Sequence, residues 1–271
     1  MFRLVLVDAT NRVNVMSRSP KVDDPVRSFL NEVERTAKIC GNATPILCWD
    51  HPDASEYRRK IYPSYKGQRE KVASVDLHVR ESVLASRGNY CCWWDANYEA
   101  DDLIATAAKF AGDLPLVIHS QDGDMSPLLM NPARLQITTS TSDREKIKWV
   151  SRSTVEQKLG IRLEQFIEYR ALVGDSSDNL PGVVGIGAMN ALSILQQFNT
   201  VAEAVQAGEA LTIRKDKREI LQQAYELGEF ALAVELTTLR DDAVVPTHIA
   251  EAISAAANKR PDVRLAVTPP W

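Results

Sequence analysis

Short apolar runs alternate with stretches of helical periodicity along the first half of the chain. Three of the apolar runs lead directly to carboxylates: Phe2–Val7 to Asp8, Pro45–Trp49 to Asp50, and Leu114–Ser120 to Asp122 and Asp124. Helical spacing of apolar residues fills the intervals, in Val26–Ile39, Val72–Ala85 and Ala100–Phe110. Strands that alternate with helices predict an α/β fold whose mainly parallel central sheet is flanked by helices.

The pattern changes after residue 150. Leu135–Thr139 and Ile147–Val150 are expected to complete the sheet, and from Thr154 onward the periodicity is helical, interrupted by a glycine-rich stretch that ends at Gly187. We therefore expect an α/β domain over 1–150 and a helical region over 151–271. The proline-containing tail from Arg260 lacks periodicity and is expected to be poorly ordered.

Composition narrows the class of protein. The chain of 271 residues is 45% hydrophobic and 25% charged, as in an ordinary globular protein. No apolar run reaches the length of a membrane span, and Phe2–Val7 is too short for a signal-peptide core. The four cysteines lack the spacing of a zinc site. These features predict a cytoplasmic protein with no membrane partner.

The net charge of −4 argues superficially against a nucleic-acid partner, but the distribution of charge matters more than its sum. Basic residues gather between Arg58 and Lys71 and again between Arg214 and Arg218. The first cluster includes tyrosines whose faces could stack on bases, while its cations match phosphates. On composition alone it is equally consistent with a solvated basic loop.

Carboxylates form the most informative pattern in the chain. Nine of them stand at strand ends or in closely spaced pairs: Asp8, Asp50, Glu99, Asp101, Asp102, Asp122, Asp124, Asp175 and Asp178. In a mainly parallel sheet, ligands bind beyond the carboxyl ends of the strands, so these acids are expected to meet there. A single aspartate is more often a turn former or a helix cap, and Asp-Gly is ordinary turn chemistry. The coincidence of so many acids favours a site.

Such a cluster of like charges is costly unless a cation intervenes. Oxygen ligands without thiolate or imidazole are the set that a hard divalent cation prefers. Because there are more acids than one ion needs, the sequence predicts two Mg²⁺ ions, with Mn²⁺ able to substitute. Two ions suit in-line hydrolysis of a phosphodiester, in which one activates water and the other stabilises the leaving oxygen.

Five segments together resemble the 5′-nuclease family, which includes phage and bacterial 5′–3′ exonucleases and flap endonucleases. They are Leu6-Val-Asp8, Tyr62-Pro-Ser-Tyr-Lys66 with Arg69, Tyr98-Glu-Ala-Asp-Asp102, Asp122-Gly-Asp124, and Leu172-Val-Gly-Asp-Ser-Ser-Asp-Asn-Leu-Pro-Gly-Val-Val-Gly-Ile-Gly187. Since no long polymerase follows, the chain resembles a stand-alone, phage-type member. The resemblance implies a PIN-like fold with a helical arch at about 55–90, and a helix–hairpin–helix (H3TH) motif in the helical region.

The resemblance also implies roles for individual residues. Asp8, Glu99, Asp101, Asp122 and Asp124 would form one metal site, and Asp175 and Asp178 would complete a second, with Asp50 and Asp102 bound to the ions or supporting their ligands. The catalytic residues would be Lys66, which touches the scissile phosphate, Arg69 beside it, Asp122 and Asp124. Val72–Ala85 would be an arch helix. Nucleic acid would contact Arg58, Tyr65, Lys66, Arg69, Gly185, Gly187, Arg214, Lys215 and Lys217.

The H3TH turn departs from the family pattern at one position. That turn usually reads Gly-Ile-Gly-x-Lys, whereas Met189 stands where the lysine is expected. Glycine amides at a helix N-terminus can still approach a phosphate, and a K⁺ ion bound by turn carbonyls is a further expectation. Weaker duplex binding is expected unless Arg214, Lys215, Lys217 or Arg218 compensates.

The sequence therefore predicts a structure-specific 5′ nuclease that acts on DNA with a 5′ flap, a nick or a free 5′ end, and on RNA–DNA hybrids. We expect a monomer that works beside replication proteins. Two alternatives stay open: a metal-dependent RNase of PIN-like fold, and a branched-DNA-binding protein with weak catalysis. The glycine turn favours a nuclease that grips duplex over a small RNase.

Overall fold

The computed structural model describes residues 1–17, 22–68, 80, 83, 90–139 and 147–259. Packing divides the chain into two compact units, each described by itself below. Unit 1 comprises residues 1–57, 70–151 and 239–271, and unit 2 comprises residues 58–69 and 152–238. This division differs from the domains 1–150 and 151–271 expected from the sequence, because the segment from Arg58 packs with the helices and the chain from Leu239 rejoins the sheet.

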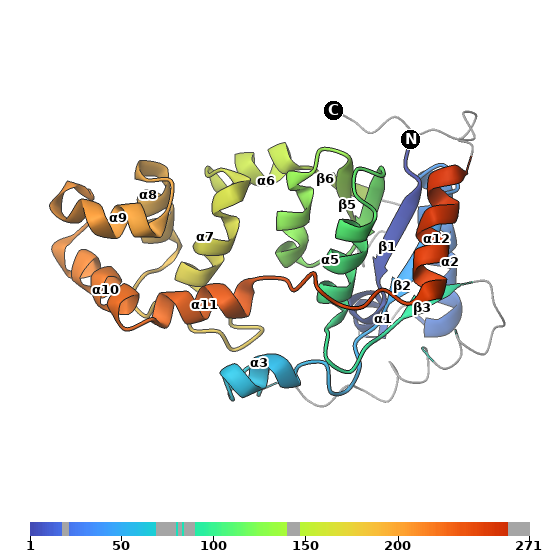
Figure 1. Cartoon of the computed structure of the whole chain (residues 1–271), viewed down its shortest axis with the longest axis horizontal. Helices are drawn as coiled ribbons and strands as arrows, with labels where there is room; N and C mark the ends of the chain where they lie inside the picture. The colour runs from blue at the N-terminus through green and yellow to red at the C-terminus, as the bar shows by residue number, and fades with distance from the viewer. Residues whose placement is uncertain (18–21, 69–79, 81–82, 84–89, 140–146, 260–271) are drawn as a thin grey trace. The chain divides into compact units, whose positions relative to one another are not determined.

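A six-stranded sheet forms the centre of unit 1 in the described part of the chain (Figure 1). Its strands are β1 (Leu4–Asp8), β2 (Thr44–Cys48), β3 (Cys91–Trp93), β4 (Leu116–His119), β5 (Arg134–Thr139) and β6 (Ile147–Val150), in the order β3-β2-β1-β4-β5-β6. Only β6 pairs antiparallel among them. The mainly parallel sheet is therefore confirmed, and it includes β3, which is too short for an apolar pattern to indicate.

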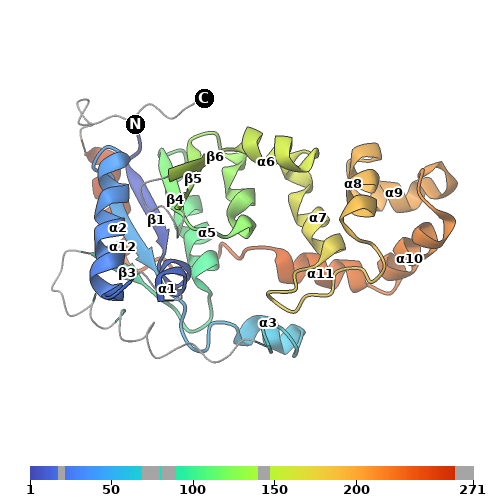
Figure 2. The ribbon, with the colours of Figure 1, turned by 180° about the vertical axis from the view of Figure 1, so that it is seen from behind.

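Helices cover both faces of this sheet. The helices α1 (Ala9–Ser17) and α2 (Pro25–Ile39) lie on one face, and α5 (Ala100–Phe110) and α12 (Thr247–Asn258) lie on the other (Figures 1 and 2). Alternate residues of β1 explain the layering, since Val5 and Val7 join Phe29 of α2 in one buried cluster. Asp24 caps α2 by accepting a hydrogen bond from Arg27 N at 3.0 Å. The helices expected at Val26–Ile39 and Ala100–Phe110 are confirmed.

Unit 2 is helical. Its elements are most of α3 (Glu56–Ile61), then α6 (Arg152–Leu159), α7 (Phe166–Val173), α8 (Ala188–Gln197), α9 (Val201–Ala207), α10 (Lys215–Glu226) and α11 (Glu229–Thr237), with short 3₁₀ turns at Leu163–Gln165 and Gly208–Ala210. A further 3₁₀ segment, Gly123–Met130, belongs to unit 1. The core of unit 2 gathers Leu172, Ile186, Leu195, Val201 and Leu221.

Some expectations fall outside the described residues. Arg69 does, as does the tail from Arg260, and so does the arch helix Val72–Ala85 apart from Arg80 and Val83. None of the helices within the described ranges has the length and apolar character that crossing a membrane requires.

A buried ionic cluster ties α1 and α2 to β4. The Glu32 carboxylate lies 2.7 Å from Arg12 and 2.9 Å from His119 Nε2. Burial lowers the pKa of His119, whose Nδ1 lies 3.3 Å from the Thr36 hydroxyl. Burial alone would raise the pKa of Glu32, but His119 and Arg12 outweigh it and lower the pKa to about 2.

Glu32→Gln should flatten the loss of stability in acid. Because the pKa of Glu32 in the folded protein, about 2, lies below its ordinary value of 4.5, its contribution is complete above the ordinary value and disappears as pH falls through the folded one. One such group adds at most about 1.4 kcal/mol per pH unit to the slope of unfolding free energy. Urea unfolding between about pH 5 and about pH 3 measures that slope, which should be smaller in the variant.

The matched control is Glu34→Gln, at an exposed position of the same helix, which should keep the wild-type slope. At neutral pH, Glu32→Gln should also lower the unfolding free energy by about 3 kcal/mol, because it removes the carboxylate that the buried Arg12 guanidinium contacts at 2.7 Å. Parallel pH curves for Glu32→Gln and the wild type would contradict this account of the cluster.

Candidate active site

The acids of unit 1 stand where parallel strands end and where α5 begins. Asp8 closes β1, Asp50 follows β2, and Asp122 and Asp124 follow β4. Glu99 is the N-cap of α5, whose first turn holds Asp101 and Asp102. The structure thus brings these seven predicted ligands to one edge of one sheet. Among the described residues, however, no three His, Cys, Asp or Glu side chains gather closely enough to form a metal-binding group by themselves.

Asp8 is the most constrained of these acids. Its side chain is buried, with Oδ1 accepting from Asn11 N at 3.0 Å and Oδ2 from Ser120 Oγ at 2.8 Å. Burial, followed by the charge of Asp50, raises the pKa of Asp8 to about 7, and Asp122 adds to the effect. The two hydrogen bonds oppose this shift without cancelling it. Asp8 is therefore a carboxyl that an added cation would ionise.

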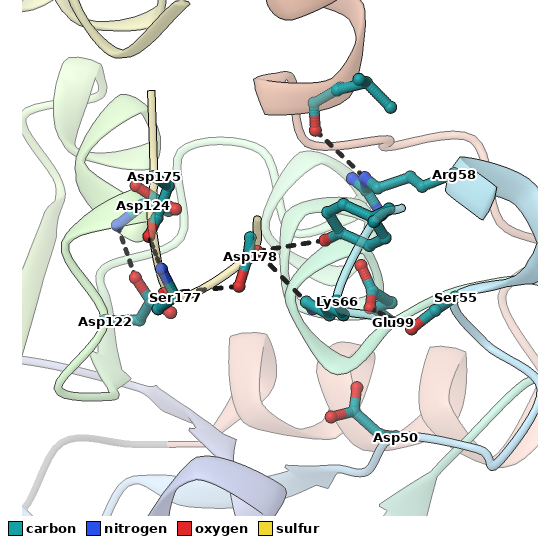
Figure 3. Close-up of polar contacts among 12 residues, drawn as sticks. Asp50, Ser55, Arg58, Lys66, Glu99, Asp122, Asp124, Asp175, Ser177 and Asp178 are labelled. Atoms are coloured by element: carbon teal, nitrogen blue, oxygen red, sulfur yellow. Dashed lines mark hydrogen bonds and ion pairs between the residues drawn. The ribbon is translucent and has the colours of Figure 1, made fainter. Parts of the chain in front are cut away.

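Two further acids of this edge hold neighbouring segments together. Asp50 Oδ1 accepts from Ala100 N at 2.7 Å, so the carboxylate after β2 caps the first turn of α5. Glu99 is buried and accepts from Ser55 Oγ at 2.6 Å (Figure 3). These two hydrogen bonds fix the positions of the two carboxylates relative to α5 and to the segment at Ser55.

Asp102 has a structural role that its spacing did not indicate. It is fully buried, and its Oδ2 accepts from Glu99 N at 3.2 Å. Its Oδ1 accepts from Arg240 N at 2.9 Å, on the segment that rejoins unit 1. The Arg240 guanidinium in turn lies 3.9 Å from the centroid of the Tyr98 ring. Asp102 therefore joins distant parts of unit 1, and its contribution to a metal site stays a prediction.

Asp101 is half-buried and also belongs to this edge. Cys48 lies at the end of β2, and the pKa of its thiol is raised well above the ordinary value. Burial is the largest cause, the charge of Asp8 comes next, and the charge of Asp101 also contributes. One thiol thus experiences the fields of two predicted ligands.

The loop after β4 is held by a chain of hydrogen bonds. Asp122 Oδ1 accepts from Asp124 N at 2.9 Å, which forms the turn that Asp-Gly dipeptides favour (Figure 3). Asp122 N donates to Ser120 Oγ at 3.0 Å, the hydroxyl that also reaches Asp8. Asp122 therefore forms an ordinary turn with its side chain, and the same turn places Asp122 and Asp124 after β4.

In unit 2, the structure brings together Lys66 and Asp178, which the sequence places far apart. Lys66 Nζ lies 3.8 Å from Asp178 Oδ2, and Lys66 N donates to Asp178 O at 2.9 Å (Figure 3). Lys66 has a φ of 52°, in the left-handed region that residues other than glycine rarely adopt. Such strain persists where surrounding contacts enforce it, often at functional sites.

Asp175 is also paired with a cation, the guanidinium of Arg170. Burial would raise the pKa of Asp175, but hydrogen bonds from Ser177 and the charge of Arg170 outweigh burial and lower the pKa. The two predicted ligands of unit 2 thus lie beside positive charge, in contrast to Asp8.

Arg58 and Tyr65 are buried in unit 2, and their contact with nucleic acid stays a prediction. The Arg58 side chain donates to Leu236 O at 3.2 Å and to Thr238 O at 3.1 Å, so it binds the carbonyls at the end of α11. Tyr65 is 3% exposed, and its hydroxyl donates to Asp178 Oδ2 at 3.2 Å. The Lys66 ammonium lies 5.0 Å from the centroid of the Tyr65 ring, so the ring supports that cation.

The H3TH turn leads into α8. Its apolar side chains Val183 and Ile186 are buried, whereas Met189 in the first turn of α8 is 82% exposed. Gly185 has a φ of 95°, and a Cβ there would lie 3.1 Å from Ile220 and 3.7 Å from Lys217 Nζ, so the turn packs directly against α10. Gly187 is the N-cap of α8.

The structure places the four cations that could compensate for Met189 in different surroundings. Lys217 lies beside the H3TH turn, with its Nζ 3.6 Å from Asp216 Oδ2. Arg218 binds the carbonyls of Leu211 and Ile213. The other two, Arg214 and Lys215, have side chains exposed by 78% and 81% and lie in ion pairs with acids of α10.

Two family models match the chain. One, described as the N-terminal resolvase-like domain of 5′-3′ exonuclease, matches residues 13–160, and one described as its C-terminal SAM fold matches residues 161–260. A flap endonuclease Xni from Shewanella loihica is 28% identical over 264 residues, which cover 92% of this chain and 96% of that protein. A flap endonuclease Xni from Vibrio cholerae is 30% identical over 216 residues, covering 74% of this chain and 79% of that protein.

Solved structures share the fold. A T5 5′-exonuclease with bound zinc aligns with a TM-score of 0.76 at 21% identity and covers 94% of this chain and 98% of that one. A bacteriophage T5 flap endonuclease in complex with DNA and metal ions aligns with a TM-score of 0.73 at 22% identity, covering 94% and 99%.

The fold and the acids at the sheet edge define a nuclease of the 5′-nuclease class. The chain belongs to the 5′–3′ exonuclease family, whose two models together match residues 13–260. It is a hydrolase of phosphodiester bonds, of the 5′–3′ exonuclease and flap endonuclease type. The comparisons favour neither the small RNase nor the inactive DNA-binding protein.

Gly174→Ala should disrupt the loop that carries Asp175 and Asp178. Gly174 has a φ of 79°, and a Cβ there would lie 2.4 Å from Leu180 O and 2.6 Å from Gly182 N. Backbone must therefore move, and we expect the unfolding free energy to fall by more than about 3 kcal/mol, beyond the roughly 1–2 kcal/mol cost of a positive φ. Urea denaturation measures this.

Gly228→Ala is the control for a positive φ without a clash, because Gly228 has a φ of 77° and a Cβ there would meet nothing within 4 Å, although its ψ is 5° where that of Gly174 is −175°. The unfolding free energy of this variant should fall only by the roughly 1–2 kcal/mol that a positive φ costs an alanine. Equal losses for the two variants would mean that close packing at Gly174 does not hold the loop.

Proposed function

We propose that this enzyme is a structure-specific 5′ nuclease that cleaves DNA with a 5′ flap, a nick or a free 5′ end, and RNA–DNA hybrids, with two Mg²⁺ ions. The observation that carries the proposal is the placement of the unit 1 acids at the carboxyl edge of the sheet, where the charges of Asp50 and Asp122 act on the buried Asp8. Two named relatives are flap endonucleases, and the T5 enzyme was solved with DNA and metal ions, which supports the substrate and the metals.

The donor chemistry at this edge fits a hard divalent cation. The carboxylate oxygens are the ligands that Mg²⁺ prefers, and Mn²⁺ would substitute. We assign Asp8, Glu99, Asp101, Asp122 and Asp124 to one ion, and Asp175 and Asp178 to completion of the second, with Asp50 in support. When bound, the ions supply an activated water and stabilise the leaving oxygen. A K⁺ ion at the turn carbonyls is part of the same proposal.

Lys66 is the proposed cation for the scissile phosphate. Its ammonium would stabilise negative charge that develops on the phosphate oxygens in the transition state. Three observations support this role: the positive φ of Lys66, its ion pair with Asp178 and its contact with the Tyr65 ring. Together they fix the position of the ammonium before substrate binds. Arg69 is proposed to act beside it. The enzyme is further proposed to act as a cytoplasmic monomer beside replication proteins.

Asp122→Asn should abolish cleavage while leaving substrate binding largely intact. The asparagine can still accept from Asp124 N, so the turn is retained, but the charge that holds a cation is lost. We expect a fall of more than about 100-fold, beyond the effect of losing a residue that only orients a ligand. A gel assay with a 5′-labelled flap substrate, with Mg²⁺ and with EDTA, measures cleavage, and filter binding measures affinity.

The control is Asp241→Asn, an exposed acid paired with Lys109 at 3.0 Å, which should cleave as the wild type does. Near-normal turnover by Asp122→Asn, or cleavage that resists EDTA, would contradict the assignment. Parallel substrates of RNA–DNA hybrid and single-stranded RNA separate the proposed nuclease from an RNase.

Lys217 is proposed to supply the positive charge at the H3TH turn that a lysine at position 189 would otherwise provide. Its Nζ would lie 3.7 Å from a Cβ on Gly185, so its ammonium stands beside the glycines of the turn, whereas Arg214 and Lys215 extend into solvent. A phosphate at the turn would then meet both backbone N–H groups and an ammonium.

Lys217→Met should weaken duplex binding and reduce the dependence of log affinity on log salt by about one unit, because one phosphate contact is lost. Filter binding of duplex DNA over a series of salt concentrations measures both. Lys215→Met, on the same helix but 81% exposed, is the control and should change the slope less. Met189→Lys should strengthen binding.

Equal slopes for Lys217→Met and the wild type would exclude Lys217 from the duplex contact. Unchanged affinity and salt dependence in Met189→Lys would show that the turn does not need a cation at that position.

A further inference from the structure

A buried glutamine lies behind the loop that carries Asp122 and Asp124. Gln136 belongs to β5, where it is 2% exposed between the apolar residues Leu135 and Ile137. Its register partner on β4 is Ile118, so its side chain lies near the point where β4 ends. A polar side chain buried in a sheet is costly unless its hydrogen bonds are made.

The Gln136 amide makes two such bonds, both to the loop. Its Nε2 donates to Ser120 O at 3.0 Å and to Asp122 O at 2.7 Å, which uses both protons of the NH₂ group. The same loop is fixed from its other side, because Ser120 Oγ donates to Asp8 Oδ2 and accepts from Asp122 N. The Gln136 amide thus fixes the backbone at Ser120 and Asp122. This segment follows β4, and its Ser120 side chain also contacts Asp8 at the end of β1.

The chemistry of an amide suits this place. Lysine or arginine would bring a positive charge beside Asp8 and Asp122 and compete with a metal ion for them. An apolar side chain would leave two buried carbonyls without their donor. Glutamine supplies two donors and no charge, so it orders the loop without adding a positive charge that would compete with a metal ion.

We propose that Gln136 is a positioning residue for the metal site, which holds Ser120 and Asp122 so that the carboxylates of Asp8 and Asp122 are arranged before an ion binds. The proposal rests on the proposed function, since it takes both acids as metal ligands. Without the amide, binding must order the loop as well, which weakens the affinity for metal. Residues that orient metal ligands typically contribute about 10–100-fold to affinity.

The test is Gln136→Met, which keeps the length of the side chain and removes both donors. Calorimetric titration of the full chain with Mg²⁺ alone should give a dissociation constant raised about 10-fold. In flap cleavage, the half-saturating Mg²⁺ concentration should rise by a similar factor, while turnover at saturating Mg²⁺ changes little. A residue with a merely structural role would not change the metal dependence.

The matched control is Gln165→Met in unit 2. Gln165 is also buried, and its Nε2 donates to three backbone carbonyls, those of Leu195, Phe198 and Asn199. It should lose thermal stability and bind Mg²⁺ as the wild type does. If Gln136→Met does not fold, Gln136→Asn retains an amide on a shorter stem and should show a smaller rise.

Wild-type Mg²⁺ affinity in folded Gln136→Met, or an equal loss in Gln136→Met and Gln165→Met, would overturn the positioning role and leave the proposed nuclease intact. Failure of the wild type itself to bind Mg²⁺ would instead overturn the metal site, and the role of Gln136 with it.

Discussion

The burial of like charges at one edge of the sheet is the constraint on which the rest of the structure depends. Asp8 is enclosed at the end of β1, and the fields of Asp50 and Asp122 help to bring its pKa to about 7. The fold must therefore hold mutually repelling groups in place. Hydrogen bonds from Asn11 N and Ser120 Oγ hold Asp8, while Ala100 N donates to Asp50 and Ser55 Oγ to Glu99. These bonds fix geometry and leave a cation favourable.

The two predicted ligands of unit 2 lie beside cations of the same unit. Asp175 lies against Arg170, and Asp178 against Lys66 and Tyr65, so their charge is balanced from within the unit. The contrast appears in the pKa values, which burial and neighbouring acids raise at Asp8, whereas Ser177 and Arg170 overcome burial and lower the pKa of Asp175. A metal ion would gain most from the electrostatics at Asp8. At Asp175 and Asp178 it would have to compete with cations already present.

The sequence predicted what depends on local pattern, namely the apolar runs, the acids that follow them and the helices of regular period. Contacts between distant segments carried no local signal. Asp102 accepts from Arg240 N, 138 residues later, and Arg58 binds carbonyls at the end of α11, so spacing and charge alone suggested a ligand and a phosphate contact instead. Gln136 was also missed, although a lone glutamine between apolar residues of a strand is a signal that could have identified it.

The conformation of the H3TH turn does not depend on the position at which this chain departs from the family pattern. Its conformation is held by buried Val183 and Ile186 and by the positive φ of Gly185, and none of these contacts involves residue 189. Because Met189 is 82% exposed, packing makes no demand on that position and its side chain can change without altering the turn. The proposal that Lys217 supplies a positive charge at the turn follows from this, because α10 packs against Gly185. Conformation and charge at the turn are thus separate requirements, and the sequence motif encodes them together only when both come from one segment.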